Sequence, residues 1–179
     1  MVAKKQNKMQ NSQQIPAEPL RLLKEGQEFH FQDPPDYAAA ESSYRQAIDL
    51  ATDWGEPVHW LACVLRDQNK LEEAAVADRK AILLLPSDPR PILTLGWILT
   101  SLEQYPEAAE LLEKGLELKP HYGEADSRLV LAEVYDHLGQ VDKAVALWRQ
   151  IIGMDSMYPS YGQPMEEAKK KLAEHGLAT

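Results

Sequence analysis

Hydrophobic and polar residues along the middle of the chain follow the spacing of amphipathic helices. In residues 92–99 and 108–118, apolar side chains recur at i, i+3, i+4 and i+7, which places them on one face of a helix. Ala, Leu, Glu and Lys dominate the second stretch, and these residues favour helix. Pro106 fits the first turn of that helix, where a backbone N–H needs no intrahelical partner. The pattern predicts two helices joined by a short turn.

This helix pair recurs along the chain with a period close to 34 residues. Alanines with steps of 34, 34 and 36 residues mark the period: Ala40, Ala74, Ala108 and Ala144. Pro86, Pro89 and Pro91 interrupt the helical pattern between two units. The chain is therefore predicted to be a row of helix hairpins, each of which needs its neighbours to bury its apolar face.

The repeated unit resembles the tetratricopeptide repeat. That family places a small residue on the first helix, Ala on the second helix and Pro at the end of the unit. Residues 89–122 match best, with Gly96, Tyr105, Ala108 and Pro120 in the expected places. The resemblance covers roughly residues 19–158 in four units, at about 19–54, 55–88, 89–122 and 125–158.

The resemblance implies an all-α fold: a right-handed superhelical solenoid of four antiparallel helix hairpins with a C-terminal capping helix. Residues 1–17 are rich in Gln, Asn and Lys and are expected to form a disordered basic tail. Residues 18–158 hold the repeats, and residues 159–179 form the capping helix and tail. Pro164 suits the start of that helix and Gly176 suits its end.

Small residues are expected where the two helices of each hairpin cross closely. A larger residue there would overpack the crossing, at a cost of about 1–3 kcal/mol. These positions are Gly26, Ala62, Gly96 and Ala132 on the first helices, and Ala40, Ala74, Ala108 and Ala144 on the second. Asp78 departs from the pattern, because the family has a large apolar residue there. We expect Asp78 at a half-exposed edge; the alternative is a buried partner for a cation.

Composition narrows the class of protein. The chain has 179 residues, a net charge of −9 and one cysteine, Cys63, which excludes an internal disulfide and a Cys-based zinc site. The longest aliphatic run, residues 81–85, is far shorter than the ~20 apolar residues of a membrane helix. No secretory signal follows Met1, and an acidic chain lacks the basic footprint of a nucleic-acid binder. We expect a cytoplasmic protein that binds neither nucleic acid nor the membrane interior.

Candidate catalytic chemistry is sparse. The sequence contains no phosphate-binding loop, no H-E-x-x-H zinc motif, no G-x-S-x-G nucleophile motif and no G-x-G-x-x-G motif. The five histidines show no metal-ligand spacing. Cys63 has no activator next to it in the sequence and is interpreted as a packing residue. We therefore predict a non-catalytic protein without cofactor or metal.

The resemblance also implies where a guest would bind, because the first helix of each unit lines a concave face in this family. The inward positions are Leu23, Gln27, His30 and Phe31; His59, Cys63, Arg66 and Asp67; Arg90, Leu93, Trp97 and Thr100; and Asp126, Leu129, Glu133, Asp136 and His137. Trp97 is either a binding hot spot in this groove or a packing residue between hairpins, and the sequence favours neither.

The expected partner is a protein or peptide. Some family members grip the C-terminal carboxylate of heat-shock chaperones with Lys, Asn and Arg residues. Here those positions hold Leu23, Gln27, Trp60 and Thr94, and only Arg90 matches, so this activity is disfavoured. The sequence favours a scaffold that binds a peptide with apolar and basic residues; the alternative is a small acidic chaperone or assembly factor that shields a client subunit. Self-association stays open.

Overall fold

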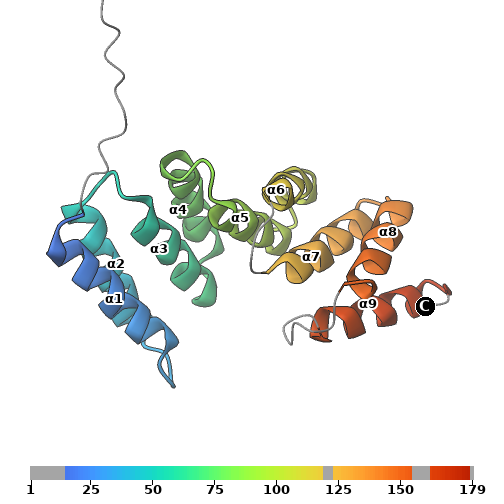
Figure 1. Ribbon diagram of the computed structural model, residues 1–179, viewed down its shortest axis with the longest axis horizontal. Helices are drawn as coiled ribbons and strands as arrows, with labels where there is room; N and C mark the ends of the chain where they lie inside the picture. Colours follow the sequence, from blue (N-terminus) through green and yellow to red (C-terminus); the bar gives the residue numbers. More distant parts are fainter. Residues whose placement is uncertain (1–14, 119–122, 155–161, 178–179) are drawn as a thin grey trace, which may run out of the picture.

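The computed structural model describes residues 15–118, 123–154 and 162–177. These residues form helices and no strand (Figure 1). The helices are α1 (Ala17–Phe31), α2 (Tyr37–Leu50), α3 (Gly55–Asp67), α4 (Leu71–Leu84), α5 (Pro89–Ser101), α6 (Tyr105–Glu117), α7 (Glu124–His137), α8 (Val141–Ile152) and α9 (Gly162–Glu174). Within the described part of the chain, no helix is long and apolar enough to cross a membrane.

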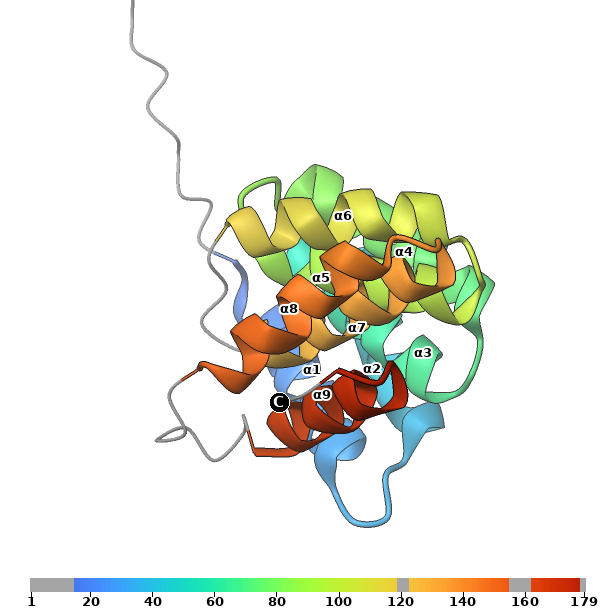
Figure 2. The same cartoon turned by 90° about the vertical axis from the view of Figure 1, so that its right-hand side faces the viewer.

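The helices pair into four hairpins that stack in chain order. The pairs are α1 with α2, α3 with α4, α5 with α6 and α7 with α8, and each second helix also packs on the first helix of the next pair. The first helices α1, α3, α5 and α7 contact one another in turn. Figure 1 shows the row as an arch, with α4, α6 and α8 above α3, α5 and α7; Figure 2 views it from its C-terminal end. The predicted all-α repeat fold is confirmed.

Local sequence sets where the helices begin. The side chain of Asp36 accepts a hydrogen bond from the N–H of Ala39 (3.0 Å) and caps α2. Asp88 caps α5 in the same way through the N–H of Arg90 (2.9 Å). Proline stands in the first turn of both α5 and α6, as the sequence predicts for Pro106.

The turn inside each of the last three hairpins repeats one backbone geometry. Asn69, Glu103 and Gly139 adopt left-handed backbone angles, with φ near 60–70°. In each turn the next residue donates its N–H to a carbonyl in the last turn of the preceding helix, at 2.8–2.9 Å. The sequence period of 34 to 36 residues is therefore also a period of backbone conformation.

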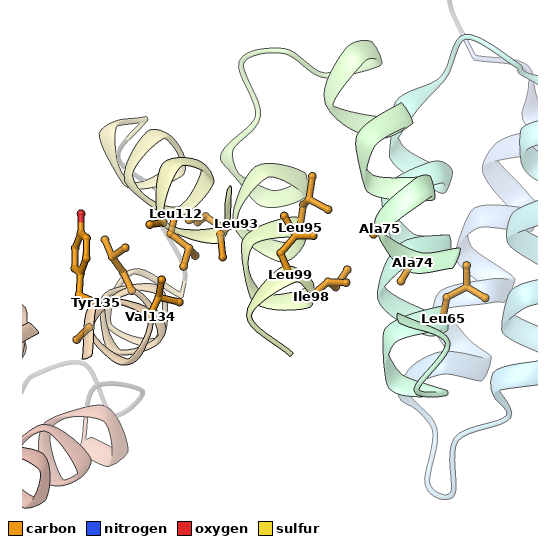
Figure 3. Packing of buried hydrophobic residues seen from close by; sticks show 14 of the residues in the cluster. Leu65, Ala74, Ala75, Leu93, Leu95, Ile98, Leu99, Leu112, Val134 and Tyr135 are labelled. Carbon is orange, nitrogen blue, oxygen red and sulfur yellow. The ribbon is translucent and has the colours of Figure 1, made fainter. Parts of the chain in front are cut away.

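The core runs continuously through the stacked hairpins. The alanines on the second helices (Ala40, Ala74, Ala108 and Ala144) are fully buried, as are Ala62 and Ala132 on the first helices. A Cβ atom on Gly26 would lie 2.6 Å from Tyr44, and one on Gly96 would lie 2.7 Å from Leu112. Figure 3 shows members of this buried cluster distributed over successive hairpins, among them Leu99 on α5 and Val134 on α7. Since no hairpin buries its apolar face alone, stacking supplies the core.

Helix α9 continues the row at its C-terminal end. It packs on α8 and also contacts α7, as the first helix of a further hairpin would. Ala168 and Leu172 are fully buried, and Gly176 has φ 70° just beyond the helix end. Residues 1–14, 159–161 and 178–179 of the predicted tail and cap lie outside the described residues, as do residues 121–122 of the short insertion before α7.

Candidate protein-binding face

The predicted inward positions divide into three groups by exposure. The buried ones are Leu23, His30, His59, Cys63 and Leu93. The half-buried ones are Gln27, Arg66, Trp97, Thr100, Leu129 and Asp136. The exposed ones are Phe31, Asp67, Arg90, Asp126, Glu133 and His137. Only the last two groups offer surface to a guest.

Two of the buried inward residues, Leu93 and His59, face the second helix of their own hairpin. The side chain of Leu93 lies against Gly115 of α6, where an added Cβ would meet Leu93 at 2.5 Å. His59 likewise reaches Asp78 of α4, with Nδ1 3.0 Å from Oδ1. Leu23 and Leu93 therefore belong to the core rather than to the exposed apolar surface of the groove.

A series of side-chain contacts crosses the face from α1 to α5. His30 Nε2 lies 2.9 Å from Asp67 Oδ2 on α3, and Asp67 accepts hydrogen bonds from the guanidinium of Arg66 (2.9 and 3.0 Å). Arg66 in turn lies over the ring of Trp97 on α5, 5.9 Å from its centroid. Burial would raise the pKa of Asp67, but His30 and Arg66 outweigh it and hold that pKa below its usual range.

Aromatic side chains lie at both ends of this series of contacts. Phe31 stacks on His30 (centroids 4.6 Å apart), lies edge-on to Trp60 (5.5 Å) and is still 65% exposed. Trp97 is half-buried, with its ring 3.7 Å from the position of a Cβ on Gly123, just before α7. Its indole N–H is buried with no hydrogen-bond partner among the described residues. Trp97 thus packs between hairpins and also presents part of its ring to the face.

The C-terminal part of the face is acidic. Glu133 and Asp136 of α7 line a hollow of about 320 Å³; its other lining residues are Leu129 and His137 of α7, Trp148 of α8, and Glu167 and Lys171 of α9. Asp136 lies 3.2 Å from His175, which follows α9. Partial burial raises the pKa of Asp126 at the start of α7. Helix α9 therefore closes this end of the face, where it adds the carboxylate of Glu167 and the ammonium group of Lys171.

Arg90 is engaged by carboxylates on both sides. Its guanidinium lies 2.8 Å from Glu56 of α3 and 2.6 Å from Asp88 at the start of α5. These hydrogen bonds raise the pKa of Arg90 above its usual range. The arginine links two neighbouring hairpins, and its charge is already balanced within the protein.

The expectation that Asp78 stands at a half-exposed edge is wrong. Asp78 is 0% exposed and pairs with His59, whose Nε2 lies 3.8 Å from the sulphur of Cys63. A buried carboxylate needs such a partner, which agrees with the alternative of a buried partner for a cation. Burial opposes the charge on His59, but hydrogen bonds to Asp78 and Cys63 outweigh it and raise the pKa of His59 to about 10. Burial raises the pKa of Asp78 to about 6, although His59 lowers it.

The sequence does carry a signal for this cluster. His59 and Cys63 are four residues apart, which places them one turn apart on one helix face. Thirty-four residues after His59 and Asp78 stand Leu93 and Leu112, so two polar departures occur in one hairpin. Among the described residues, no group of three or more His, Cys, Asp and Glu side chains is placed to hold a metal.

Solved structures with the same architecture come from several proteins. MamA from Desulfovibrio magneticus RS-1 is 17% identical with a TM-score of 0.74, over 90% of this chain and 89% of that one. Pseudomonas aeruginosa PilF is 16% identical with a TM-score of 0.73, over 88% and 70%. The first repeat domain of Spaghetti (RPAP3), bound to the HSP90 peptide SRMEEVD, is 21% identical with a TM-score of 0.63, over 68% and 94%. At these identities the likeness shows the fold.

The sequence comparisons identify the repeat itself. No curated protein is significantly similar to the chain in sequence. Residues 99–161 match the sequence model of the family described as Tetratricopeptide repeat. That match covers the second half of the array, and the solved structures extend the same fold over the remaining hairpins. Residues 99–161 are therefore similar in sequence to the tetratricopeptide repeat, and the described hairpins share the fold of the solved repeat structures.

Proposed function

We propose that the chain is a non-catalytic protein-interaction module that binds a peptide or protein segment along the face formed by α1, α3, α5 and α7. The observation that carries this proposal is the row of side chains on that face. Phe31 is exposed, Trp97 is partly exposed, and Glu133 is exposed further along the row. Aromatic residues in partly desolvated sites are the usual hot spots of protein interfaces.

The chemistry of the face favours a guest with apolar anchors and basic residues. Phe31 and Trp97 suit apolar side chains, and Arg66 already covers part of the Trp97 ring. Glu133 and Asp126 are exposed beyond them, so Lys or Arg residues of a guest would meet negative charge there. A guest that lies along the face would place its apolar part near α1 to α5 and its basic part near α7.

Recognition of an acidic C-terminal peptide fits this face poorly. The positions that supply Lys and Asn in peptide-clamping relatives hold Leu23, Gln27 and Trp60 here. Arg90, the one matching position, is paired with Glu56 and Asp88. An acidic guest would therefore have to displace two internal carboxylates and approach a negative surface.

A peptide library tests the proposal. The immobilised full chain is offered random peptides, and we expect enrichment of sequences with an aromatic or aliphatic anchor and at least one Lys or Arg. The affinity of enriched peptides should fall as salt rises, because exposed carboxylates on the face are screened. The double variant Glu133→Gln/Asp126→Asn should lower the affinity for basic peptides and leave apolar peptides largely unaffected.

Two outcomes would contradict the proposal. Enrichment of acidic C-terminal peptides would mean that the carboxylates of the face do not select the guest. Enrichment of no peptide, together with suppressed aggregation of an unfolding client, would favour the small acidic chaperone instead. We also propose a cytoplasmic location for the chain.

A further inference from the structure

Three polar side chains form a connected line beneath the inner face of the second hairpin. Asp78 Oδ1 lies 3.0 Å from His59 Nδ1, and His59 Nε2 lies 3.8 Å from the Cys63 sulphur. Asp78 is fully buried, His59 is 4% exposed and Cys63 is 7% exposed. The order carboxylate, imidazole, thiol is the order in which enzymes arrange a base to activate a cysteine.

The fold does not require these three polar side chains. The corresponding positions of the third hairpin, 34 residues later, hold Leu93, Trp97 and Leu112. Those residues bury apolar surface at the same crossing without any ionisable group. The second hairpin therefore carries polar groups where an apolar set is sufficient for packing.

The surroundings add further polar groups that packing leaves without partners. The second oxygen of Asp78 and the hydroxyl of Tyr44 are buried with no hydrogen-bond partner among the described residues. Burial raises the pKa of the Tyr44 phenol on α2, and the nearby sulphur of Cys63 contributes to the same direction. Arg66, one turn beyond Cys63 on α3, and Asp88, at the start of α5, are the charged groups that act on the pair from nearby.

We propose that Cys63 is a nucleophilic thiol and a modification site that takes low-molecular-weight disulfides. Asp78 accepts the Nδ1 hydrogen of His59, which leaves Nε2 facing the sulphur to receive its proton. Burial lowers the pKa of His59, but its hydrogen bonds to Asp78 and Cys63 outweigh this effect and favour the protonated imidazole.

The reaction is a thiol–disulfide exchange. The Cys63 sulphur attacks one sulphur of the disulfide, a new sulphur–sulphur bond forms and the old one breaks. The other half leaves as a thiolate and takes the proton that His59 received. The products are a mixed disulfide on Cys63 and one small thiol, and no further oxidant is consumed.

The position of Cys63 links this chemistry to the inner face. Cys63 occupies the inward position that Gln27 holds in the first hairpin and Trp97 in the third, and both of these are partly exposed. An adduct there would stand on the face beside Trp97 and compete with a guest. This consequence rests on the proposed function; the reactivity does not, so the two can fail separately.

The test measures adduct formation on the folded full chain. Wild type, Asp78→Asn and the double variant His59→Leu/Asp78→Leu are incubated with oxidised glutathione near pH 7, and intact mass is followed with time. Each chain has one cysteine, so one glutathione adduct is expected, and Cys63→Ser should gain none. We expect wild type to react roughly tenfold faster than either variant, because only wild type has an oriented base.

The double variant guards against loss of the fold, since it gives the second hairpin the leucines of the third. Circular dichroism establishes which variants are folded, and only those rates are compared. Equal rates in wild type and the folded double variant would overturn the proposal. A wild-type rate that appears only in denaturant would also overturn it, because Cys63 would then be an ordinary buried thiol.

Discussion

The second and third hairpins share one backbone architecture but bury different kinds of side chain where their two helices cross. At one crossing Leu93 packs against the backbone of α6 at Gly115, and Leu112 fills the space above Gly96. At the corresponding crossing in the second hairpin, His59 pairs with Asp78. Both crossings are buried, so the backbone of the repeat accepts either an apolar pair or an ion pair.

Packing and function can therefore be separated within one array of hairpins. A buried ion pair must recover the cost of removing two charges from water, whereas two leucines gain from burial outright. Replacement of such a pair by apolar residues is often neutral or stabilising. A pair retained where leucine would suffice is therefore a candidate for a role other than stability.

The largest expected effect comes from removing half of the buried pair. Asp78→Ala leaves His59 buried without its carboxylate and should lower the free energy of unfolding by about 3–5 kcal/mol. Urea denaturation followed by circular dichroism measures the change. Leu112→Ala in the third hairpin is the matched variant, with an expected loss of about 2–5 kcal/mol from the cavity. If Asp78→Ala costs less than about 1 kcal/mol, the pair is not a buried ion pair in solution.

Overpacking the crossing of α5 and α6 in the third hairpin should have the next largest effect on stability. Gly96→Val adds a branched side chain where even a Cβ would lie 2.7 Å from Leu112, and we expect a loss of about 1–3 kcal/mol. Thermal unfolding detects it. Gly162→Val is the control, because an added Cβ meets nothing within 4 Å there. Similar melting temperatures for both variants would mean that α5 and α6 do not cross as closely as described.

The pH dependence of stability should distinguish the two hairpins. The pKa of His59 is raised to about 10 in the folded chain from about 6.5 when unfolded, so its stabilising effect is present below about pH 6.5 and is lost as the pH rises toward 10. The pKa of Asp78 is also raised, to about 6, so its effect is already lost above that pH.

Unfolding free energies across pH 7 to 10 provide the measurement. Wild type should lose stability relative to His59→Leu/Asp78→Leu, by up to about 1.4 kcal/mol per pH unit. Parallel curves for the two proteins would contradict a raised His59 pKa.

The smallest expected effect belongs to the same double variant at neutral pH. With the apolar pair of the third hairpin in place, its free energy of unfolding should lie within about 1 kcal/mol of wild type or above it. Urea denaturation beside Asp78→Ala measures this. A loss as large as that of Asp78→Ala would mean that the second crossing is specific for polar side chains.

Much of the fold could be predicted from the sequence because it repeats. A small residue such as Ala74 recurs in every hairpin, so the register of the helices follows from counting. The turn residue Glu103 shows the limit, because its left-handed backbone is set by the position in the repeat and not by its own preference. Gly139 at the corresponding position carries the signal more plainly.

The candidate face could be predicted only in part. The inward positions come from the family's pattern, which does not distinguish a side chain on the face from one beneath it. Leu93 is buried because Gly115 leaves space for its side chain on α6. This contact can be recognised only from the three-dimensional structure of the hairpin. His59 and Asp78 are 19 residues apart, so their pairing depends on how α3 crosses α4. Asp78 considered alone suggests an exposed position. Considered together, His59 and Asp78 are two polar residues at apolar positions of one hairpin, which indicates that they pair with each other.

Binding of the guest to the face of α1, α3, α5 and α7 can be tested by one comparison of affinities. A basic, apolar peptide selected on wild type is titrated into wild type, Trp97→Ala and Val76→Ala by calorimetry, well below the melting temperatures. Val76 is 70% exposed on α4, a second helix that contributes none of the inward positions. Trp97→Ala should raise Kd about thirtyfold, equivalent to about 2 kcal/mol, and Val76→Ala should leave Kd unchanged. An unchanged Kd for Trp97→Ala, or an equal loss for Val76→Ala, would contradict the account.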